Sequence, residues 1–166
     1  FNNFDDKEGR FIFSEFNDFS LINMYVPNSG TNFDFRTNIW DKKLKEFIDL
    51  FIDKPLIVTG DFNVVNDIND IWNIKTLMKA DSPGVFKKER DMFHSFLENY
   101  IDIYRSKNPD KKEYTWWNMR TKSREKNQGW RIDYFLVQKQ FSNLIKDCII
   151  DTTILGSDHC PILLEL

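Results

Sequence analysis

The sequence of 166 residues has few cysteines, no long apolar run and no excess of positive charge. Two cysteines, Cys148 and Cys160, are too few for a disulfide framework in a domain of this size. We therefore expect reduced thiols in an intracellular protein. The apolar runs are much shorter than the roughly 20 residues that cross a bilayer, so we expect no membrane segment. The chain opens on FNNFDDKEGR, which has no signal-peptide character.

The charge balance excludes a simple basic nucleic-acid binder. The net charge is -3 at pH 7, whereas passive nucleic-acid binders are usually basic. A protein with this balance that binds a polyanion must concentrate its positive residues locally or bring metal ions. Hydrophobic residues make up 41% of the chain and phenylalanine occurs 16 times, which indicates a packed globular body.

The pattern of apolar residues predicts more strands than helices. Runs bounded by turn residues predict strands at 10–16, 20–26, 56–59, 114–117, 131–137, 148–154 and 162–166, the first two forming a hairpin. Helical spacing predicts helices at 37–52, with Thr37 as N-cap, at 87–100, near 70–78 and at 141–145. Segments 101–113 and 118–129 are expected to be loops. This order favours an α/β sandwich of mixed sheets over a doubly wound parallel sheet.

Polar groups follow two of the predicted strands. Asp61 and Asn63 come after the apolar run 56–59, and their spacing puts both side chains on one side of an extended backbone. A carboxylate beside an amide can hold a hard cation and orient a water, although Gly-Asp and Asn also form ordinary turns. Tyr25 and Asn28 flank a turn and could contact a phosphate. The alternative is a core tyrosine and a turn asparagine.

The last two candidate segments contain a carboxylate inside an apolar strand and an Asp-His pair. Asp133 lies in the run 131–137, where an unpaired carboxylate would be costly. A histidine is the expected partner, and pairing with Arg131 on the same strand face is the alternative. Asp158 and His159 precede the final strand, where imidazole can move protons near neutral pH. A capped turn with a surface histidine is the alternative. His94, inside the helix 87–100, is expected to be structural or solvated.

The predicted loop 118–129 is basic and flanked by tryptophans. Five positive side chains occur within twelve residues against only Glu125, namely Arg120, Lys122, Arg124, Lys126 and Arg131. This local excess could follow a phosphate backbone, and the alternative is a solvated, mobile turn. Trp116 and Trp130 flank the loop. Core packing is the alternative for Trp116 and Trp117 together, and at least one of them is expected to lie in the core.

Four short motifs resemble the endonuclease/exonuclease/phosphatase superfamily in order and spacing. They are Tyr-Val-Pro-Asn at 25–28, Gly-Asp-Phe-Asn at 60–63, Trp-Arg-Ile-Asp-Tyr at 130–134 and Ser-Asp-His-Cys-Pro at 157–161. The likeness is greatest to its exonuclease III-like apurinic/apyrimidinic endonuclease branch, and segments 6–12 and 84–90 also look like that branch. The resemblance implies a four-layer α/β sandwich of two mixed β-sheets flanked by helices.

The resemblance also implies an activity and its residues. The activity is metal-dependent hydrolysis of the phosphodiester 5′ to abasic sites in double-stranded DNA, with 3′-exonuclease or 3′-phosphodiesterase activity beside it, in base excision repair. The implied catalytic residues are Tyr25, Asp61, Asn63, Asp133 and His159. Mg²⁺, with Mn²⁺ as the alternative, is implied at Asp61, Asn63, Asp158 and His159. The implied DNA contacts are Asn28, Trp116, Arg120, Lys122 and Trp130. The compartment would be the nucleus, a mitochondrion or another DNA-containing organelle.

Two departures from the family pattern bear on these expectations. Thr31 stands where some relatives insert an arginine into DNA, so that contact is expected to be lost. The motif that supplies an early asparagine and a metal-binding glutamate is absent, and neither Glu8 nor Glu15 replaces it. We therefore expect residues 1–166 to be the C-terminal part of a single domain whose partner is its own N-terminal half. The alternatives are the same fold acting on a phosphoinositide, sphingomyelin or an RNA tail, and an inactive fragment that only binds DNA or a partner.

Overall fold

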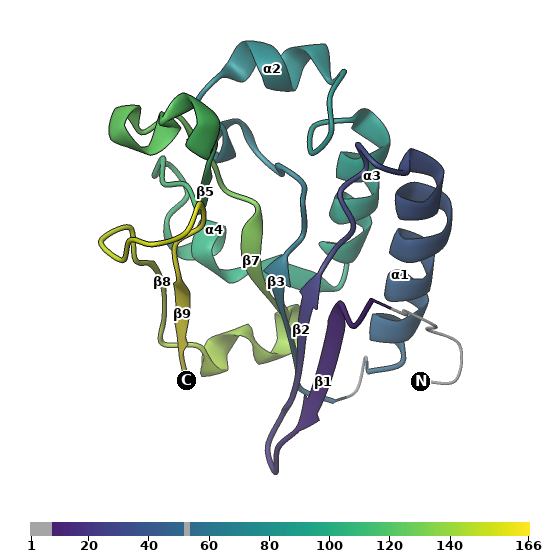
Figure 1. Ribbon diagram of the computed structural model, residues 1–166. Coiled ribbons are helices and arrows are strands. Elements are labelled where there is room, and N and C mark those ends of the chain that lie inside the picture. Colours follow the sequence, from purple (N-terminus) through teal and green to yellow (C-terminus); the bar gives the residue numbers. More distant parts are fainter. Residues whose placement is uncertain (1–7, 52–53) are drawn as a thin grey trace.

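The centre of the molecule is a mixed five-stranded sheet. The computed structural model describes residues 8–51 and 54–166 (Figure 1). The strand order is β1-β2-β3-β7-β4. The bounds are Phe11–Glu15 for β1, Ser20–Tyr25 for β2, Leu56–Asp61 for β3, Asp133–Gln138 for β7 and Tyr100–Asp102 for β4. Strands β2 and β3 are parallel and the other neighbours are antiparallel, which confirms the expected mixed sheet.

The first half of the described chain follows the predicted pattern with one correction at a helix start. Strands β1 and β2 form the expected hairpin. A π-helical segment, η1 (Phe35–Trp40), then runs into α1 (Asp41–Asp49). Thr37 does not cap this helix as predicted, because it lies inside η1 and its hydroxyl donates to the Phe33 carbonyl at 3.0 Å. The predicted end of the helix, residue 52, lies outside the described residues, as do residues 6 and 7 of the segment 6–12.

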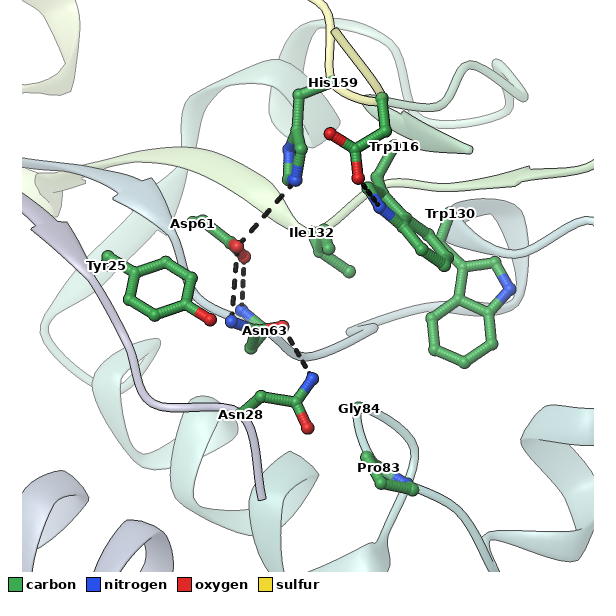
Figure 2. Close-up of a pocket in the computed structure, with 11 residues that line it drawn as sticks. Tyr25, Asn28, Asp61, Asn63, Pro83, Gly84, Trp116, Trp130, Ile132 and His159 are labelled. Atoms are coloured by element: carbon green, nitrogen blue, oxygen red, sulfur yellow. Dashed lines mark hydrogen bonds and ion pairs between the residues drawn. The ribbon is translucent and has the colours of Figure 1, made fainter. Parts of the chain in front are cut away.

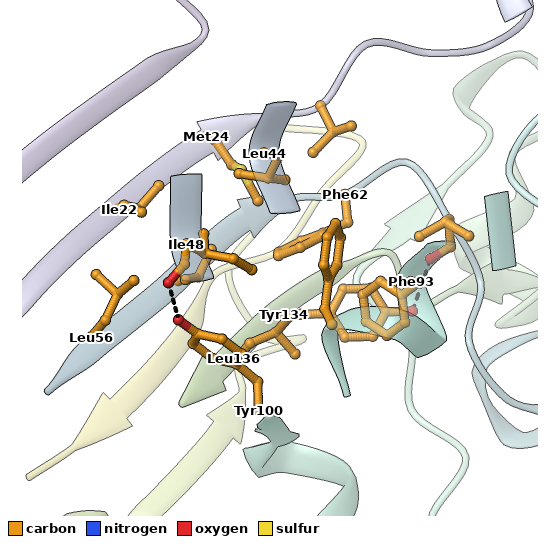
Figure 3. Close-up of a cluster of buried hydrophobic side chains, with 14 of the residues drawn as sticks. Ile22, Met24, Leu44, Ile48, Leu56, Phe62, Phe93, Tyr100, Tyr134 and Leu136 are labelled. Atoms are coloured by element: carbon orange, nitrogen blue, oxygen red, sulfur yellow. Dashed lines mark hydrogen bonds between the residues drawn. The ribbon is translucent and has the colours of Figure 1, made fainter. Parts of the chain in front are cut away.

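Helices α1 and α3 (Lys87–Phe96) cover one face of the sheet. Their apolar sides meet the sheet in the largest core cluster (Figure 3), which includes Ile22, Leu44, Ile48, Leu56, Val58, Phe93, Phe96 and Leu136. Two buried tyrosines place their hydroxyls on backbone carbonyls, Tyr100 on Ile48 at 3.0 Å and Tyr134 on Val64 at 2.8 Å. These bonds satisfy polar groups that would otherwise be costly to bury.

A second β-layer covers the opposite face. Strands β8 (Asp147–Ile150) and β9 (Ile162–Glu165) form a hairpin there, next to the short helix α4 (Ile103–Lys107). A second core cluster joins these elements to the sheet, and it contains both Cys148 and Cys160, which are buried and free. The protein is therefore a mixed α/β sandwich whose sheets are flanked by helices.

Several predicted boundaries are wrong, and short elements fill a segment expected to be a loop. The helix predicted at 87–100 ends at Phe96. Segment 101–113 contains α4 because the Asp102 carboxylate accepts from the Arg105 backbone N–H at 3.1 Å and caps this helix. The strand predicted at 148–154 ends at Ile150. The remaining short elements are η2 (Ile68–Asp70), α2 (Ile74–Lys79), β5 (Trp116–Trp117), η3 (Met119–Thr121), η4 (Ser123–Lys126), β6 (Gly129–Trp130) and η5 (Lys139–Leu144).

None of the helices found in the described part of the chain has the length and apolar character that a membrane crossing requires.

Candidate active site

Three polar residues stand in one row at an end of the central sheet. Tyr25 at the end of β2 lies opposite Asp61 at the end of β3, and Asp61 lies opposite Asp133 at the start of β7. Gly60 makes this close approach feasible. Its φ is +124°, and a Cβ there would lie 1.9 Å from the Met24 carbonyl oxygen. The sheet register therefore brings together three residues that lie far apart in the sequence.

Asn63 holds Asp61 in a fixed orientation. The Asn63 backbone N–H donates to Asp61 Oδ1 at 2.7 Å, and Asn63 Nδ2 donates to Asp61 Oδ2 at 3.2 Å. Asn63 Nδ2 also reaches the Val26 carbonyl at 2.9 Å, and Asn63 Oδ1 accepts from Asn28 Nδ2 at 3.1 Å. Asn63 has a φ of 49°, a left-handed conformation that asparagine tolerates better than most residues. Asn28, Asn63 and Asp61 thus form one chain of hydrogen bonds.

The predicted pairing of Asp133 with a histidine is confirmed. His159 Nδ1 lies 2.9 Å from Asp133 Oδ2, so its other ring nitrogen, Nε2, points toward Asp61 at 4.0 Å from Oδ2. The alternative pairing of Asp133 with Arg131 is wrong. Strand β6 ends at Trp130 and β7 begins at Asp133, and this interruption turns the Arg131 side chain into the interior.

Burial and charge shift the titration of this group of residues. Burial, and then the nearby carboxylate of Asp133, raise the pKa of Asp61 to about 7. Burial alone would lower the pKa of His159, but its hydrogen bond to Asp133 and the surrounding carboxylates raise it. The site therefore holds a carboxyl group whose pKa is about 7 next to an imidazole whose pKa is raised, a pair that suits general acid–base chemistry.

A cavity of about 340 Å³ opens beside these residues (Figure 2). Tyr25, Asn28, Asp61, Asn63, Asp158 and His159 form its polar side. Tyr25 is 47% exposed, so the alternative of a core tyrosine is wrong. Trp116, Trp130 and Ile132 form an apolar wall, and Pro83 and Gly84 lie at the edge. The sequence reasoning missed Ile132, Pro83 and Gly84 as lining residues. The segments 130–134 and 84–90, already noted for their family likeness, contained two of them.

The two tryptophans of the wall meet edge to face. Their ring centroids lie 5.8 Å apart with an interplanar angle of 68°. Trp116 also donates its indole N–H to Asp158 Oδ2 at 3.0 Å, so this carboxylate is tied to the wall of the cavity. Trp117 is the tryptophan that packs in the core, as expected for one of the pair.

The positive side chains of segment 118–131 fall into two groups, those exposed to solvent and those bonded to other parts of the protein. Arg120 in η3 and Lys122 between η3 and η4, the two basic residues among the predicted DNA contacts, are exposed outside the cavity lining. Arg124 is occupied, because its guanidinium donates to the carbonyls of Thr152, Ile154 and Ser157 and lies 4.6 Å from the Trp117 ring. The expectation that Arg131 belongs to a DNA-facing surface is wrong, since its exposure is 0%.

The four predicted metal-binding residues do not form a ready cation site. Among residues 8–51 and 54–166, no three His, Cys, Asp or Glu side chains are grouped so that they could hold a metal ion. Both Asp61 oxygens accept from Asn63, Asp158 Oδ2 accepts from Trp116, and Asn63 Oδ1 accepts from Asn28. A divalent cation prefers six or more oxygen ligands, and these side chains alone do not supply them. His94, the other histidine, is exposed on α3, as expected for a solvated residue.

The chain is similar to known nucleases over most of its length. Residues 3–159 match the Endonuclease/Exonuclease/phosphatase family. A DNA-(apurinic or apyrimidinic site) endonuclease of Dictyostelium discoideum is 42% identical over 165 residues, which cover 95% of this chain and 45% of that protein. An exodeoxyribonuclease of Bacillus subtilis is 38% identical over 163 residues, which cover 95% of this chain and 64% of that protein. The chain thus spans about half to two thirds of the length of these relatives.

A solved structure shares the arrangement of the strands and helices. The 3′ phosphatase NExo from Neisseria, bound to product DNA hairpin, superposes with a TM-score of 0.85 at 26% sequence identity. The match covers 97% of this chain and 66% of that chain. The site geometry and the likeness to known proteins therefore point to the same family.

Proposed function

The chain belongs to the endonuclease/exonuclease/phosphatase family, and we propose that it carries catalytic residues of a DNA-repair nuclease that hydrolyses the phosphodiester 5′ to abasic sites. The observation that carries this proposal is the convergence of the Asp133–His159 pair and Asp61 at the polar side of a cavity whose other side is formed by two tryptophans. Phosphodiester hydrolysis needs a proton acceptor for water and positive charge at the phosphoryl oxygens.

Asp61 is the proposed acceptor of the proton from the attacking water. Both carboxylate oxygens are oriented by Asn63, which leaves the carboxylate facing the cavity in a single orientation. Its pKa of about 7 means that the carboxylate is ionised in slightly alkaline solution and can accept a proton there. Asn63 and Asn28 are the proposed positioning groups for water and phosphate, and Tyr25 offers a phenol at the same edge.

His159 is the proposed contact to the scissile phosphate. Because Nδ1 is held by Asp133, Nε2 is the nitrogen that faces Asp61 and the cavity. The raised pKa of His159 favours the protonated ring, which can donate a charge-assisted hydrogen bond to a phosphoryl oxygen. Asp133 keeps the ring in one orientation and offsets its charge.

The aromatic wall supports an abasic nucleotide as the substrate. Trp116, Trp130 and Ile132 form an apolar surface that suits a sugar without a base, and the adjacent polar residues suit its phosphate. An abasic nucleotide has no base pair to break, so turning it out of the helix costs less than for an intact nucleotide. Arg120 and Lys122 are the proposed contacts to the phosphate backbone of the flanking duplex.

Mg²⁺, with Mn²⁺ as the alternative, is the proposed cofactor. AP endonucleases of this family depend on divalent metal ions in general. A bound divalent ion would supply positive charge at the phosphate. Asp61 and Asp158 are the carboxylates that would hold this ion, and waters and substrate phosphate oxygens could complete its ligand shell. A DNA substrate implies that the protein works in a DNA-containing compartment, such as the nucleus or a mitochondrion.

The test is an incision assay with the full-length protein, Mg²⁺ and a 5′-labelled duplex that contains one abasic analogue. We expect a single cut on the 5′ side of the lesion and at least about 100-fold slower cutting of the matched intact duplex. Parallel reactions contain a 3′-phosphate end, a phosphoinositide, sphingomyelin and an RNA tail. Hydrolysis of one of the last three without incision of the abasic duplex would overturn the proposal. The rate at the 3′-phosphate end, which is a phosphomonoester, measures the 3′-phosphatase activity relative to the endonuclease activity.

A further inference from the structure

A single buried threonine connects the two segments that supply the Asp133–His159 pair. Thr115 has an exposure of 0% and lies directly before β5, outside the cavity lining. Its hydroxyl oxygen accepts from the backbone N–H groups of Ile132 and Asp133, each at 3.1 Å. Its carbonyl oxygen accepts from the backbone N–H of Cys160 at 2.9 Å. One residue therefore bonds Asp133 itself and the direct neighbour of His159.

Other bonds of the same segment keep this residue in place. The Thr115 N–H donates to the Trp130 carbonyl at 2.9 Å, and the Trp117 N–H donates to the Asp158 carbonyl at 2.9 Å. Trp116 also forms an isolated β-bridge with His159. Segment 115–117 is thus held between the start of β7 and the loop that carries His159. The hydroxyl is the one polar side-chain group of Thr115, and both bonds that it makes within the described part of the chain are to the segment that enters β7.

The hydroxyl matters because of a gap in the strand pairing. Residues 131 and 132 lie between β6 and β7, where the regular ladder is interrupted. The N–H groups of Ile132 and Asp133 turn toward Thr115, and without this acceptor they would be left without a hydrogen-bond partner, which is unfavourable in the protein interior. The direction of the Asp133 backbone at the site is therefore set by the Thr115 oxygen.

We propose that Thr115 is a positioning residue that sets the distance and orientation of the Asp133–His159 pair. It touches neither the cavity nor the reacting atoms, so it acts through Asp133 and the segment of His159. The pair spans a contact of 2.9 Å between residues 26 positions apart, and a shift of either segment would lengthen it. A displacement of about 1 Å at a catalytic group can lower a rate about 100-fold. The kinetic part of this inference rests on the proposed function.

The test uses the full-length protein and a graded series at one position. Thr115→Ser keeps the acceptor oxygen, Thr115→Cys replaces it with a weaker and longer acceptor, and Thr115→Val keeps the shape without an acceptor. Thr37→Val is the matched control, because Thr37 is also buried and its hydroxyl also bonds a backbone group, the Phe33 carbonyl, away from the site.

Two readouts are measured for each variant. The ring ¹⁵N and ¹H chemical shifts of His159 report its bond to Asp133 without any substrate, with the exposed His94 ring as the internal reference. The kcat and KM for incision of an abasic duplex report the reaction. We expect Thr115→Val to move the His159 shifts and to lower kcat about 100-fold with KM within about threefold. Thr115→Ser should stay within about threefold of the unaltered protein, and Thr115→Cys should lie between the two.

The outcomes separate positioning from simple destabilisation. The proposal is overturned if Thr115→Val leaves the His159 shifts unchanged, or if Thr37→Val produces the same change in shifts and kcat. If Thr115→Val does not fold, the His159 shifts and the kcat of Thr115→Cys are compared with those of Thr115→Ser. The proposal is then overturned if these two variants do not differ. If the unaltered protein does not incise abasic DNA, the proposed function fails, and the His159 shifts still decide the role of Thr115.

Discussion

The segment that enters β7 takes part in two clusters of charged residues, one through Arg131 and the other through Asp133. The two clusters differ in how the negative charge of their carboxylates is balanced. In the first, Arg131 lies between Asp70 and Asp102. In the second, Asp133 and Asp61 lie opposite each other, and His159 is the ion-pair partner of both among the described residues. The first cluster is closed to solvent, whereas the second lines a cavity or lies directly beside it.

The Arg131 cluster has every charge matched. The Arg131 guanidinium donates to both oxygens of Asp70 at 2.6 and 2.8 Å, and to both oxygens of Asp102 at 3.1 and 2.6 Å. The ring of Tyr134 lies 4.5 Å from the guanidinium carbon, and Arg105 forms a further ion pair with Asp70. Burial would lower the pKa of Arg131, but the two carboxylates keep it well above its ordinary value, so the guanidinium stays charged. This cluster joins three segments of the chain.

The Asp61–Asp133 cluster has an excess of negative charge. Among the described residues its ion-pair partner is the His159 imidazole. Burial, and then the charge of Asp133, raise the pKa of Asp61 to about 7, although His159 and the more distant Arg36 act in the opposite direction. Such an arrangement costs folding free energy and leaves a group that changes protonation near neutral pH. The comparison teaches that buried carboxylates alone do not indicate a reactive site. A buried carboxylate indicates a reactive site when its cluster has no cation that matches its charge.

The largest effect is expected when the reactive cluster loses one of its paired members. Asp133→Asn and His159→Asn should each lower the rate of abasic-site incision by at least about 10³-fold. The first variant lacks the carboxylate that orients the imidazole, and the second lacks the imidazole itself. Their melting temperatures should change little. Single-turnover incision by the full-length protein is the measurement, with His94→Asn as the control on exposed histidine. An incision rate within about threefold of the unaltered protein in either variant would remove the pair from the mechanism.

Substitution in the Arg131 cluster, whose charges are matched, should change the stability of the protein. Arg131→Met leaves Asp102 buried without its cation and Asp70 with Arg105 alone, and we expect the free energy of unfolding to fall by about 3–5 kcal/mol. Urea denaturation measures this loss. Arg120→Met is the control, because Arg120 is exposed and its loss should cost under about 0.5 kcal/mol. If Arg131→Met lowers the free energy of unfolding by less than about 1 kcal/mol, the Arg131 cluster does not stabilise the fold around the site.

The pH dependence of incision should reflect the unmatched cluster. Since Asp61 accepts a proton only when ionised, the rate should rise about tenfold per pH unit up to a midpoint no higher than about 7, and then fall at higher pH as His159 loses the proton that it donates to the phosphate. Single-turnover rates between pH 5 and pH 9 provide the profile, with the folded state checked at each pH. A rate that falls steadily as the pH rises from 5 to 7 would contradict the role of Asp61.

The smallest effect is expected at the exposed basic turns. Arg120→Ala and Lys122→Ala should each reduce the slope of log affinity against log salt by about 0.9, if each neutralises one phosphate. Fluorescence anisotropy with an abasic duplex in the presence of EDTA measures this slope. Lys146→Ala is the control, since Lys146 is exposed beside β8, outside the cavity lining. Identical slopes for the unaltered protein and the three variants would show that Arg120 and Lys122 do not contact the phosphate backbone of the DNA.

The reactive cluster could be predicted from the sequence because each member lies directly before, directly after or inside an apolar strand. Asp61, Asn63, Asp133 and His159 were found in this way, and the structure brings them together. The matched cluster could not be found, because the role of Arg131 depends on the break between β6 and β7, which no local pattern marks. Its partners Asp70 and Asp102 lie 61 and 29 residues away, in segments interpreted as irregular or as a loop. Charge clusters formed across such distances are visible only in the folded chain.

The most direct test of this contrast is Asp61→Asn, measured for incision and melting temperature in the same preparation at pH 8. A carboxyl whose pKa is raised on folding contributes stability below its unfolded pKa, near 3.8, and that stability is lost as the pH rises through about 7. At pH 8 without metal the ionised Asp61 therefore destabilises the folded protein. We expect the variant to melt a few degrees higher while incision with Mg²⁺ falls at least about 10³-fold. A variant that melts lower or still incises abasic DNA would contradict the assignment of Asp61 as the unmatched, reactive carboxylate.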